Sequence, residues 1–373
     1  MPIVPGPQVT PLERIPTADS PAGPSTLVLT AHVSVRIDGI SRPELDALVI
    51  EWLIEERINR PARFELVVQN HGPSGLRFED RRLFEFGKTV EVLGPGGASL
   101  FKGLVFAIGD EFAASAPPRA RLVAADRLER LASTRRSRSF SNTADSAVIQ
   151  RIASEHGLQA SVNLTTPTRP SVSQLDCSDL DFLRQIAARC DARLRLDDTR
   201  LIVQRFDNLD LPPPSFMLGQ DLQSFAVSAD LRSQPTSVSV SGWSAAAGSA
   251  VGASATPVAA DFDVPGGDSG ASIGQAALGT SVFTLASTSA GTPDEAGLQA
   301  RTLMAAQARR FVSARGRLGT LAEGLHAGSV VTLLGLGRLH SGRYRIAALR
   351  RRFDTVQGPY TEFEALRNSI GRP

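Results

Sequence analysis

The segment from Val172 to Gln204 constrains the fold most, because its hydrophobic period changes once along its length. Apolar residues first recur every three or four positions, which is the spacing of one face of a helix: Leu180, Leu183, Ile186, Ala187 and Cys190. They then alternate with charged residues, as in a half-buried strand that turns at Asp197 to Thr199 and returns. The segment therefore predicts a strand, a helix and a hairpin in succession.

The start of this helix is marked by its side-chain chemistry. Ser178 is placed to act as the N-cap, and Asp181 follows three residues later. Asp179 and Asp181 fall in the first turn, where the helix dipole favours negative charge. We expect Arg184 and Arg189 on the solvent-facing side.

Short runs of alternating or β-branched residues, each closed by Gly, Pro, Asn or Asp, lie on both sides of this segment. Such spacing is typical of small antiparallel barrels. The first group of expected strands lies near residues 33–37, 47–54, 64–68, 89–92 and 101–108. The second group lies near residues 225–229, 237–240, 328–334, 342–350 and 360–366.

Helix signals and a basic loop fill the remainder. We expect a strand at residues 120–124, followed by a basic loop with Arg135, Arg136 and Arg138. A helix comes next, which we expect Thr143 to cap and Gly157 to end. A later helix begins at Thr292, followed by a proline and a glutamate in capping positions, and is expected to end near Gly316.

The fold class expected is therefore mainly β with an α+β insertion: two small, tube-like antiparallel β-barrel domains around a helix-containing middle domain. Proline-rich residues 1–26 predict an extended arm, disordered until something binds it, with order beginning near Leu27. The domains expected are the first barrel at 27–112, the middle domain at 113–224 and the second barrel at 225–373. The second barrel includes an Ala/Gly/Ser-rich excursion at 244–290, much of which we expect to be mobile.

Composition excludes several classes of function. The 40 basic and 38 acidic residues nearly cancel, and aromatic residues are 6% of the chain, which argues against specific nucleic-acid binding. The chain has only two cysteines, and its histidines do not have the spacing of metal ligands. We therefore expect no disulfide scaffold and no metal or cofactor site. We expect no membrane span and no ordinary secretion signal, and hence folding in the cytoplasm.

Several motifs then follow one another in an order that resembles a known family. They are Thr89–Val92 with Leu100–Val105, Ala125–Leu128, His156–Leu158, Asp179–Arg184, Val240–Trp243, Gly328–Val331, Ser341–Ile346 and Thr361–Phe363. Together they resemble the late control D family of contractile phage tails and the N-terminal portion of VgrG proteins, which are baseplate hubs. The signature residues carried over as structural are Gly103, Asp179, Asp181, Phe182, Leu183, Trp243, Gly342 and Tyr344.

The resemblance implies a structural role without catalysis. It implies a homotrimer that joins a hexameric tail tube to a trimeric spike, as a symmetry adaptor inside a phage tail or injection particle. Because the sequence stops at Pro373, where VgrG chains continue into a needle, we expect a separate protein to supply the spike. Other baseplate proteins and a tape-measure protein complete the expected partners.

Other interpretations remain open on the residues alone. Asp176, Asp179 and Asp181 could serve as acid, base or cation ligands in a tail-associated cell-wall hydrolase, although helix capping explains the last two. Cys177 lacks a paired base, so an inert thiol is favoured. The Gly94–Gly97 run lacks the lysine of a phosphate loop and is interpreted as a hairpin loop. Two runs of arginines could bind an acidic protein, or the phosphates of nucleic acid if the chain is a nucleic-acid-binding regulator. Solvated arginines are the default interpretation. The runs are Arg135, Arg136 and Arg138, and Arg350, Arg351 and Arg352.

Overall fold

The computed structural model describes residues 33–73, 75–78, 82–207, 212–257, 267–288 and 290–372, all within the unit Ala31–Pro373. The predicted arm at 1–26 and the predicted start of order at Leu27 lie outside these residues. Residues 258–266 of the predicted excursion lie outside them too.

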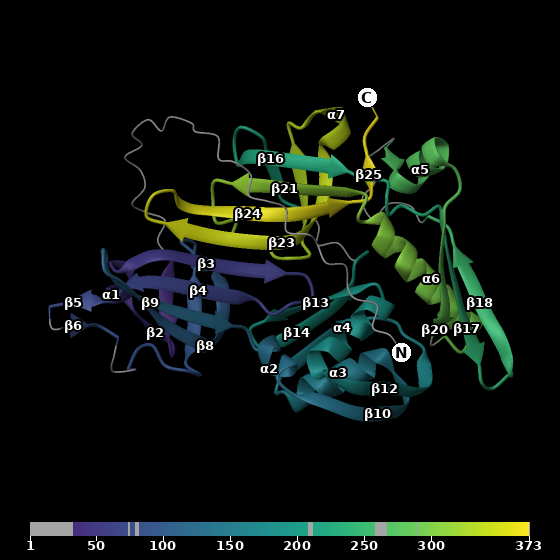
Figure 1. Cartoon of the computed structure of the whole chain (residues 1–373), viewed down its shortest axis with the longest axis horizontal. Coiled ribbons are helices and arrows are strands. Elements are labelled where there is room, and N and C mark those ends of the chain that lie inside the picture. The colour runs from purple at the N-terminus through teal and green to yellow at the C-terminus, as the bar shows by residue number, and fades with distance from the viewer. Residues whose placement is uncertain are drawn as a thin grey trace. The chain divides into compact units, whose positions relative to one another are not determined.

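A 13-stranded sheet runs through both predicted β regions (Figure 1). Its first part, here called the first β unit, pairs antiparallel throughout and encloses one apolar core because alternate side chains face inward. Asp38 and Gly39 have φ of 51° and 77° and so form the tight turn that was predicted after the first strand. The unit comprises β1 (Ser34–Ile37), β2 (Ile40–Ser41), α1 (Pro43–Asp46), β3 (Val49–Arg57), β4 (Arg63–Gln69), the small hairpin β5 (His71–Gly72) and β6 (Gly75–Leu76), β7 (Thr89–Leu93), β8 (Ser99–Ala113) and β9 (Ala116–Ala125).

The second β unit has a core of its own and belongs to the same sheet. Strands β3 and β23 pair antiparallel from Ala348 opposite Arg57 to Asp354 opposite Glu51, and this pairing joins the two units. The second unit comprises β15 (Ser215–Met217), β16 (Leu222–Ala229), β21 (Val312–Leu318), β22 (Val330–Leu334), α7 (Gly337–His340), β23 (Gly342–Asp354) and β24 (Gly358–Arg367).

The middle region is an α+β insertion with a third core, built from the apolar face of α4 that the sequence predicted. Ser178 is the N-cap, because its Oγ accepts a hydrogen bond from the Asp181 backbone N–H at 3.0 Å. The hairpin after the helix is present, so the predicted strand-helix-hairpin unit is confirmed. The region comprises α2 (Leu128–Ala132), β10 (Arg135–Ala144), α3 (Asp145–Glu155), β11 (Gln159–Asn163), β12 (Thr168–Ser178), α4 (Asp179–Arg189), β13 (Ala192–Asp197) and β14 (Arg200–Arg205).

The Ala/Gly/Ser-rich stretch, for which mobility was expected, contains strands and a helix where it is described. Two of its strands pair with β17, and helix α6 packs on this small sheet around a fourth core. Serine and alanine alternate too weakly in hydrophobicity for these strands to show in the sequence. The elements are β17 (Ser237–Ser244), β18 (Ser249–Ala255), α5 (Gly270–Leu278), β20 (Val282–Thr288) and α6 (Pro293–Ala308), with β19 (Asp268–Ser269) paired to β25 (Ser369–Ile370).

The predicted fold class is confirmed: the chain is mainly β, with antiparallel units on either side of an α+β insertion. Strand β9 falls within the region predicted as the middle domain, yet it pairs with β4 and β8 of the first β unit.

Three local predictions were wrong. Ala144 is the N-cap residue of α3, because Thr143 still lies within strand β10, where it pairs with Arg169, and the strand ends at Ala144. Helix α6 ends at Ala308, and Gly316 lies in strand β21, where the Phe363 ring occupies the space of a β-carbon. The basic loop is part of strand β10.

Candidate functional site

The strongest signature motif places one carboxylate at the centre of a polar cluster. Asp179 is fully buried at the first turn of α4. Its Oδ1 accepts hydrogen bonds from Arg138 Nη2 and Gln174 Nε2, both at 2.9 Å. Its Oδ2 lies 2.8 Å from His156 Nε2 and 3.5 Å from Arg136 Nε. These five residues are called the Asp179 cluster below.

Local structure explains how four elements meet at this carboxylate. Arg138 of β10 lies opposite Gln174 of β12, and a bulge follows on β12, where Asp176 adopts a φ of 42°. His156 caps the C-terminus of α3, and Gly157 ends that helix with a φ of 68°, as predicted. The strand pair and both helices are therefore tied to one acid.

The cluster is saturated with donors. Burial by itself would raise the pKa of Asp179, but hydrogen bonds from His156 and Gln174 and the charges of Arg138 and Arg136 outweigh it and lower the pKa. A general acid must carry a proton, and a cation ligand must offer free lone pairs. Both oxygens of Asp179 already accept from donors of the cluster, so the arrangement joins secondary-structure elements.

The three neighbouring aspartates do not form one site. Asp176 is exposed on the bulge, 3.1 Å from Arg135 Nε. Asp181 is also exposed, and its carboxylate accepts hydrogen bonds from Ser178 Oγ at 2.7 Å and Arg184 Nη1 at 2.9 Å. Among the described residues, no group of three or more His, Cys, Asp or Glu side chains is placed to bind a metal ion.

Arg184 joins the middle region to the first β unit, which corrects its predicted exposure to solvent. Its Nε donates to the backbone oxygen of Asn59 at 2.6 Å, and Asn59 Oδ1 accepts from the Leu194 backbone N–H at 2.8 Å. Asn59 has a φ of 60°, a conformation that asparagine tolerates better than most residues. Arg189 is half-buried as well and pairs with Asp145 at 2.8 Å.

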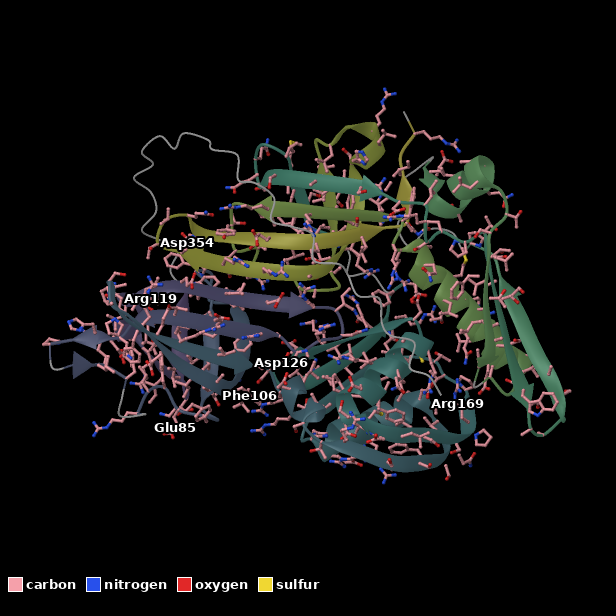
Figure 2. The ribbon with its side chains drawn as sticks, viewed as in Figure 1. Glu85, Phe106, Arg119, Asp126, Arg169 and Asp354 are labelled. Carbon is pink, nitrogen blue, oxygen red and sulfur yellow. The ribbon has the colours of Figure 1, made fainter. Side chains whose placement is uncertain are left out.

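Helix α6 is tied to the middle region by polar contacts of its own. Arg169 of β12, which Figure 2 labels, has its Nη1 3.2 Å from Glu295 Oε1. Thr302 Oγ1 donates to the backbone oxygen of Arg189 at 3.2 Å. Arg309 and Asp191 form a buried ion pair near the end of α6. Buried pairs of this kind fix the relative placement of elements more than they add stability.

A buried ion pair also lies where the two β units join. Arg351 of β23 is fully buried, and its Nη1 donates to Glu56 Oε1 of β3 at 2.7 Å. Glu56 Oε2 lies 3.2 Å from His326 Nδ1. Burial would raise the pKa of Glu56, but His326 and Arg351 together lower it to about 2. Glu56 is therefore a carboxylate at neutral pH.

The neighbouring arginines on β23 face outward and are paired. Arg350 lies 3.0 Å from Glu55 Oε1 and 3.6 Å from Glu364 Oε1, and Arg352 lies 3.4 Å from Glu362 Oε2. The default interpretation of solvated arginines is wrong for Arg351, which is buried, and incomplete for the other two. Because their charges are largely neutralised within the sheet, they are poor ligands for a phosphate backbone.

A cavity of about 290 Å³ lies between the first β unit, the β13–β14 hairpin and the segment around Ala327. Asp126, which Figure 2 labels, lines this cavity at the end of β9. Its Oδ2 accepts from the Ala62 backbone N–H and its Oδ1 from the Leu128 backbone N–H, both at 2.9 Å. Burial raises the pKa of Asp126, and these two hydrogen bonds lower it by less. The resulting pKa is about 7.

This shift predicts a pH dependence of stability. The folded-state pKa of Asp126 lies above its unfolded value of about 3.9. The stabilisation that protonated Asp126 adds to the free energy of unfolding is therefore complete below about pH 4 and is lost as the pH rises towards 7. Urea titrations between pH 5 and pH 8 should show that Asp126→Asn removes a downward slope of up to about 1.4 kcal/mol per pH unit. Parallel curves for the two proteins would contradict the assignment.

The structure distributes the remaining signature residues over different cores. Phe182 and Leu183 are buried in the middle region, where Phe182 stacks on Phe140 at 6.1 Å. Gly103 of β8 leaves no room for a β-carbon, which would overlap the backbone oxygen of Ala125. Tyr344 is buried in the second β unit, and its hydroxyl donates a hydrogen bond to the His340 backbone oxygen at 2.7 Å.

Of the last two signature residues, Gly342 has a special backbone conformation and Trp243 is exposed. Gly342 begins β23 with a φ of 133°, which other residues rarely adopt. Trp243 is the last residue but one of β17, and 59% of its surface is exposed. The eight residues are therefore not gathered into one site. The polar roles of Asn59, Asp126 and Glu56 were missed in the sequence, although Asp126 lies within the Ala125–Leu128 motif.

The other chemical candidates have structural explanations. Burial raises the pKa of Cys190 to about 12 and raises that of half-buried Cys177 as well, so neither thiol is activated. The Gly94–Gly97 run is the β7–β8 hairpin loop, as predicted, and the Gly96 N–H donates to Glu323 Oε1 at 2.9 Å. None of the described helices has the length and apolar character needed to cross a membrane.

Similar solved structures are tail proteins. The chain resembles the 43 kDa tail protein of prophage MuSo2 from Shewanella oneidensis with a TM-score of 0.71 and 11% identity, over 90% of this chain and 98% of that one. It resembles a tail protein from Neisseria meningitidis MC58 with a TM-score of 0.66 and 12% identity, over 90% and 96%. It also resembles an E. coli component of the type VI secretion system, described as similar to the T4 bacteriophage tail proteins gp27 and gp5, with a TM-score of 0.54 and 12% identity, over 91% and 79%.

The resemblance to proteins of phage tails and related secretion systems, predicted from ordered motifs, is thus confirmed at the level of the fold. No curated protein is detectably similar to the chain in sequence. A family model described as the Alg8 N-terminal domain matches residues 28–354, which is most of the 373-residue chain. The chain therefore belongs to the Alg8 N-terminal domain family.

Proposed function

We propose that the chain is a structural baseplate hub protein of a contractile phage tail or a tail-like injection system. The observation that carries this proposal is the extent of the fold similarity. Nine tenths of the chain superimposes on nearly the whole of two phage or prophage-type tail proteins. Fold alone does not determine function, so the proposal also rests on the ordered motifs and on the site.

The proposed hub is a trimer that acts as a symmetry adaptor between a hexameric tail tube and a separate trimeric spike. Two antiparallel β units per chain would present six such units per ring, which matches a sixfold partner. The β3–β23 pairing and the Glu56–Arg351 ion pair support this role, because they hold the two units of each chain in one orientation. In this proposal the particle's other baseplate and tape-measure proteins are further partners.

In this proposal the signature residues stabilise the fold of the hub and take no part in catalysis. The Asp179 cluster unites the middle region, Arg184 ties it to the first β unit, and Arg169 ties it to α6. A cell-wall hydrolase would need an accessible pair of carboxylates. The acids singled out in the sequence are buried and saturated at Asp179, or exposed and paired with arginine at Asp176 and Asp181.

Assembly state tests the proposal. We expect the purified chain, co-expressed with the tube and spike proteins of its own genome, to sediment as a three-copy ring bound to both. Tube and spike should each be retained through two purification steps on a tag carried by the hub. A chain that stays monomeric at high concentration and binds neither protein would contradict the proposed function.

A further inference from the structure

The small sheet β18–β17–β20 differs from the rest of the chain in its charge. Its three strands contain no Lys, Arg, Asp or Glu, although 21% of the chain is charged. The outward-facing positions carry serine, alanine, glycine and threonine, together with the exposed Trp243 and Val282. A protein surface usually carries interspersed charges that keep it soluble. This surface therefore differs from an ordinary solvated one.

The apolar inner face of this sheet is only partly covered. Helix α6 packs against β17 and β18. Phe283 of β20 lies opposite buried Val238 on the inner face, yet 40% of its surface is exposed. Leu278, the last residue of α5, and Val282, which lies opposite Ser237 on the other face of the sheet, are also exposed, at 74% and 56%. Residues 275–284 form an uninterrupted exposed run without a charge. Large apolar side chains exposed together in this way mark interaction surfaces.

Both edges of the sheet are open in the part of the chain that the structure describes. There, β18 and β20 each pair with β17 alone. Exposed edge strands are normally protected by lysine, proline or a bulge, because their free N–H and C=O groups pair readily with other chains. Neither seven-residue edge strand contains a proline or a charge. The register of β20 on β17 shifts between Leu285 and Thr288, so the unprotected edges are β18 and the first four residues of β20, Val282 to Leu285. Unprotected edges are expected where another strand is meant to pair.

We propose that the β20 edge of one copy pairs with the β18 edge of the next copy, and that this contact closes the ring. The proposal rests on the proposed function and names the surface through which the copies meet. A second copy fits because both edge strands have the same length and neither carries a charge. The two edges are different surfaces, so the contact is heterologous, which is the kind that forms closed rings. Phe283, Val282 and Leu278 would become buried on the neighbouring sheet.

Variants with one blocked edge test this arrangement. Val282→Lys with Phe283→Lys blocks the β20 edge, and Ala250→Lys with Ser254→Lys blocks the β18 edge; all four positions are exposed. Each variant should weaken ring formation at least tenfold, because lysine at an edge opposes strand pairing. An equimolar mixture of the two variants keeps one intact contact, so it should yield two-copy complexes and no ring. Val356→Lys, at a 91% exposed turn position, is the matched control and should assemble like the wild type.

The outcomes separate the two proposals. Sedimentation gives the number of copies, and thermal unfolding checks that each variant is folded. If folded edge variants form three-copy rings as the wild type does, the edge pairing is wrong and the hub function stands. If those rings persist but no longer retain the tube protein, the edges bind the tube and the proposal is overturned. If the wild type forms no ring, alone or with tube and spike, both proposals fail.

Discussion

Replacing Arg351 with alanine is expected to lower the free energy of unfolding by about 3–5 kcal/mol, because it leaves the buried carboxylate of Glu56 without its arginine partner. Arg351 Nη1 donates to Glu56 at 2.7 Å, and its Nε donates to the Leu321 backbone oxygen at 2.8 Å. Its Nη2 also donates to the Leu325 backbone oxygen. One substitution therefore removes one of the partners of Glu56, while His326 stays, and also the donor to carbonyl groups that were buried with it.

Arg350→Ala is the matched control on the adjacent residue. Arg350 pairs with Glu55 and Glu364, but it is partly exposed and solvent screens these pairs. Its removal should cost no more than about 1 kcal/mol. Urea unfolding at pH 7 measures both variants. Equal losses for the two would show that the interior pair does not hold the two β units together.

Replacing Asp179 with alanine is expected to cost a comparable amount, about 3–5 kcal/mol. The variant leaves Arg138, Gln174 and His156 without the buried carboxylate that they share as an acceptor. If Asp179 acted only on the helix dipole, as its position in the sequence suggests, the loss would be about 0.3–1 kcal/mol. The size of the loss thus distinguishes a buried cluster from simple helix-start chemistry.

Ser178→Ala supplies the control for helix capping alone. Ser178 accepts from the Asp181 backbone N–H at 3.0 Å, and a lost N-cap costs about 1 kcal/mol. Urea unfolding of both variants, with circular dichroism to confirm helix content, makes the comparison. Losses of similar size in the two variants would contradict the central role of the Asp179 cluster.

Local signals were enough to predict helix α4 and the hairpin that follows it. The period of Leu180, Leu183 and Ile186 and the cap at Ser178 depend only on neighbours in the sequence. The same holds for Thr292, whose Oγ1 accepts from the Glu295 backbone N–H at 3.2 Å, as the motif predicts. The mainly β fold class followed from short strands closed by turn residues.

The polar site could not be predicted in this way, because its partners lie far apart in the chain. Arg138 is 41 residues from Asp179, and Glu56 is 295 residues from Arg351. One signal was available and unused: in a strand, three consecutive arginines cannot all face the same side, so Arg351 must face away from Arg350 and Arg352. The strands β18 and β20 were missed because small residues give almost no alternation.

The most direct test of the hub function is an electron cryomicroscopy map of assembled particles purified with a tag on this chain. The account predicts three copies of the chain in one ring between the tail tube and a spike made of a different protein. Within each copy, the two β units should be joined through β3 and β23. A map in which the chain lies away from the junction of tube and spike, or in which the ring contains a different number of copies, would contradict it.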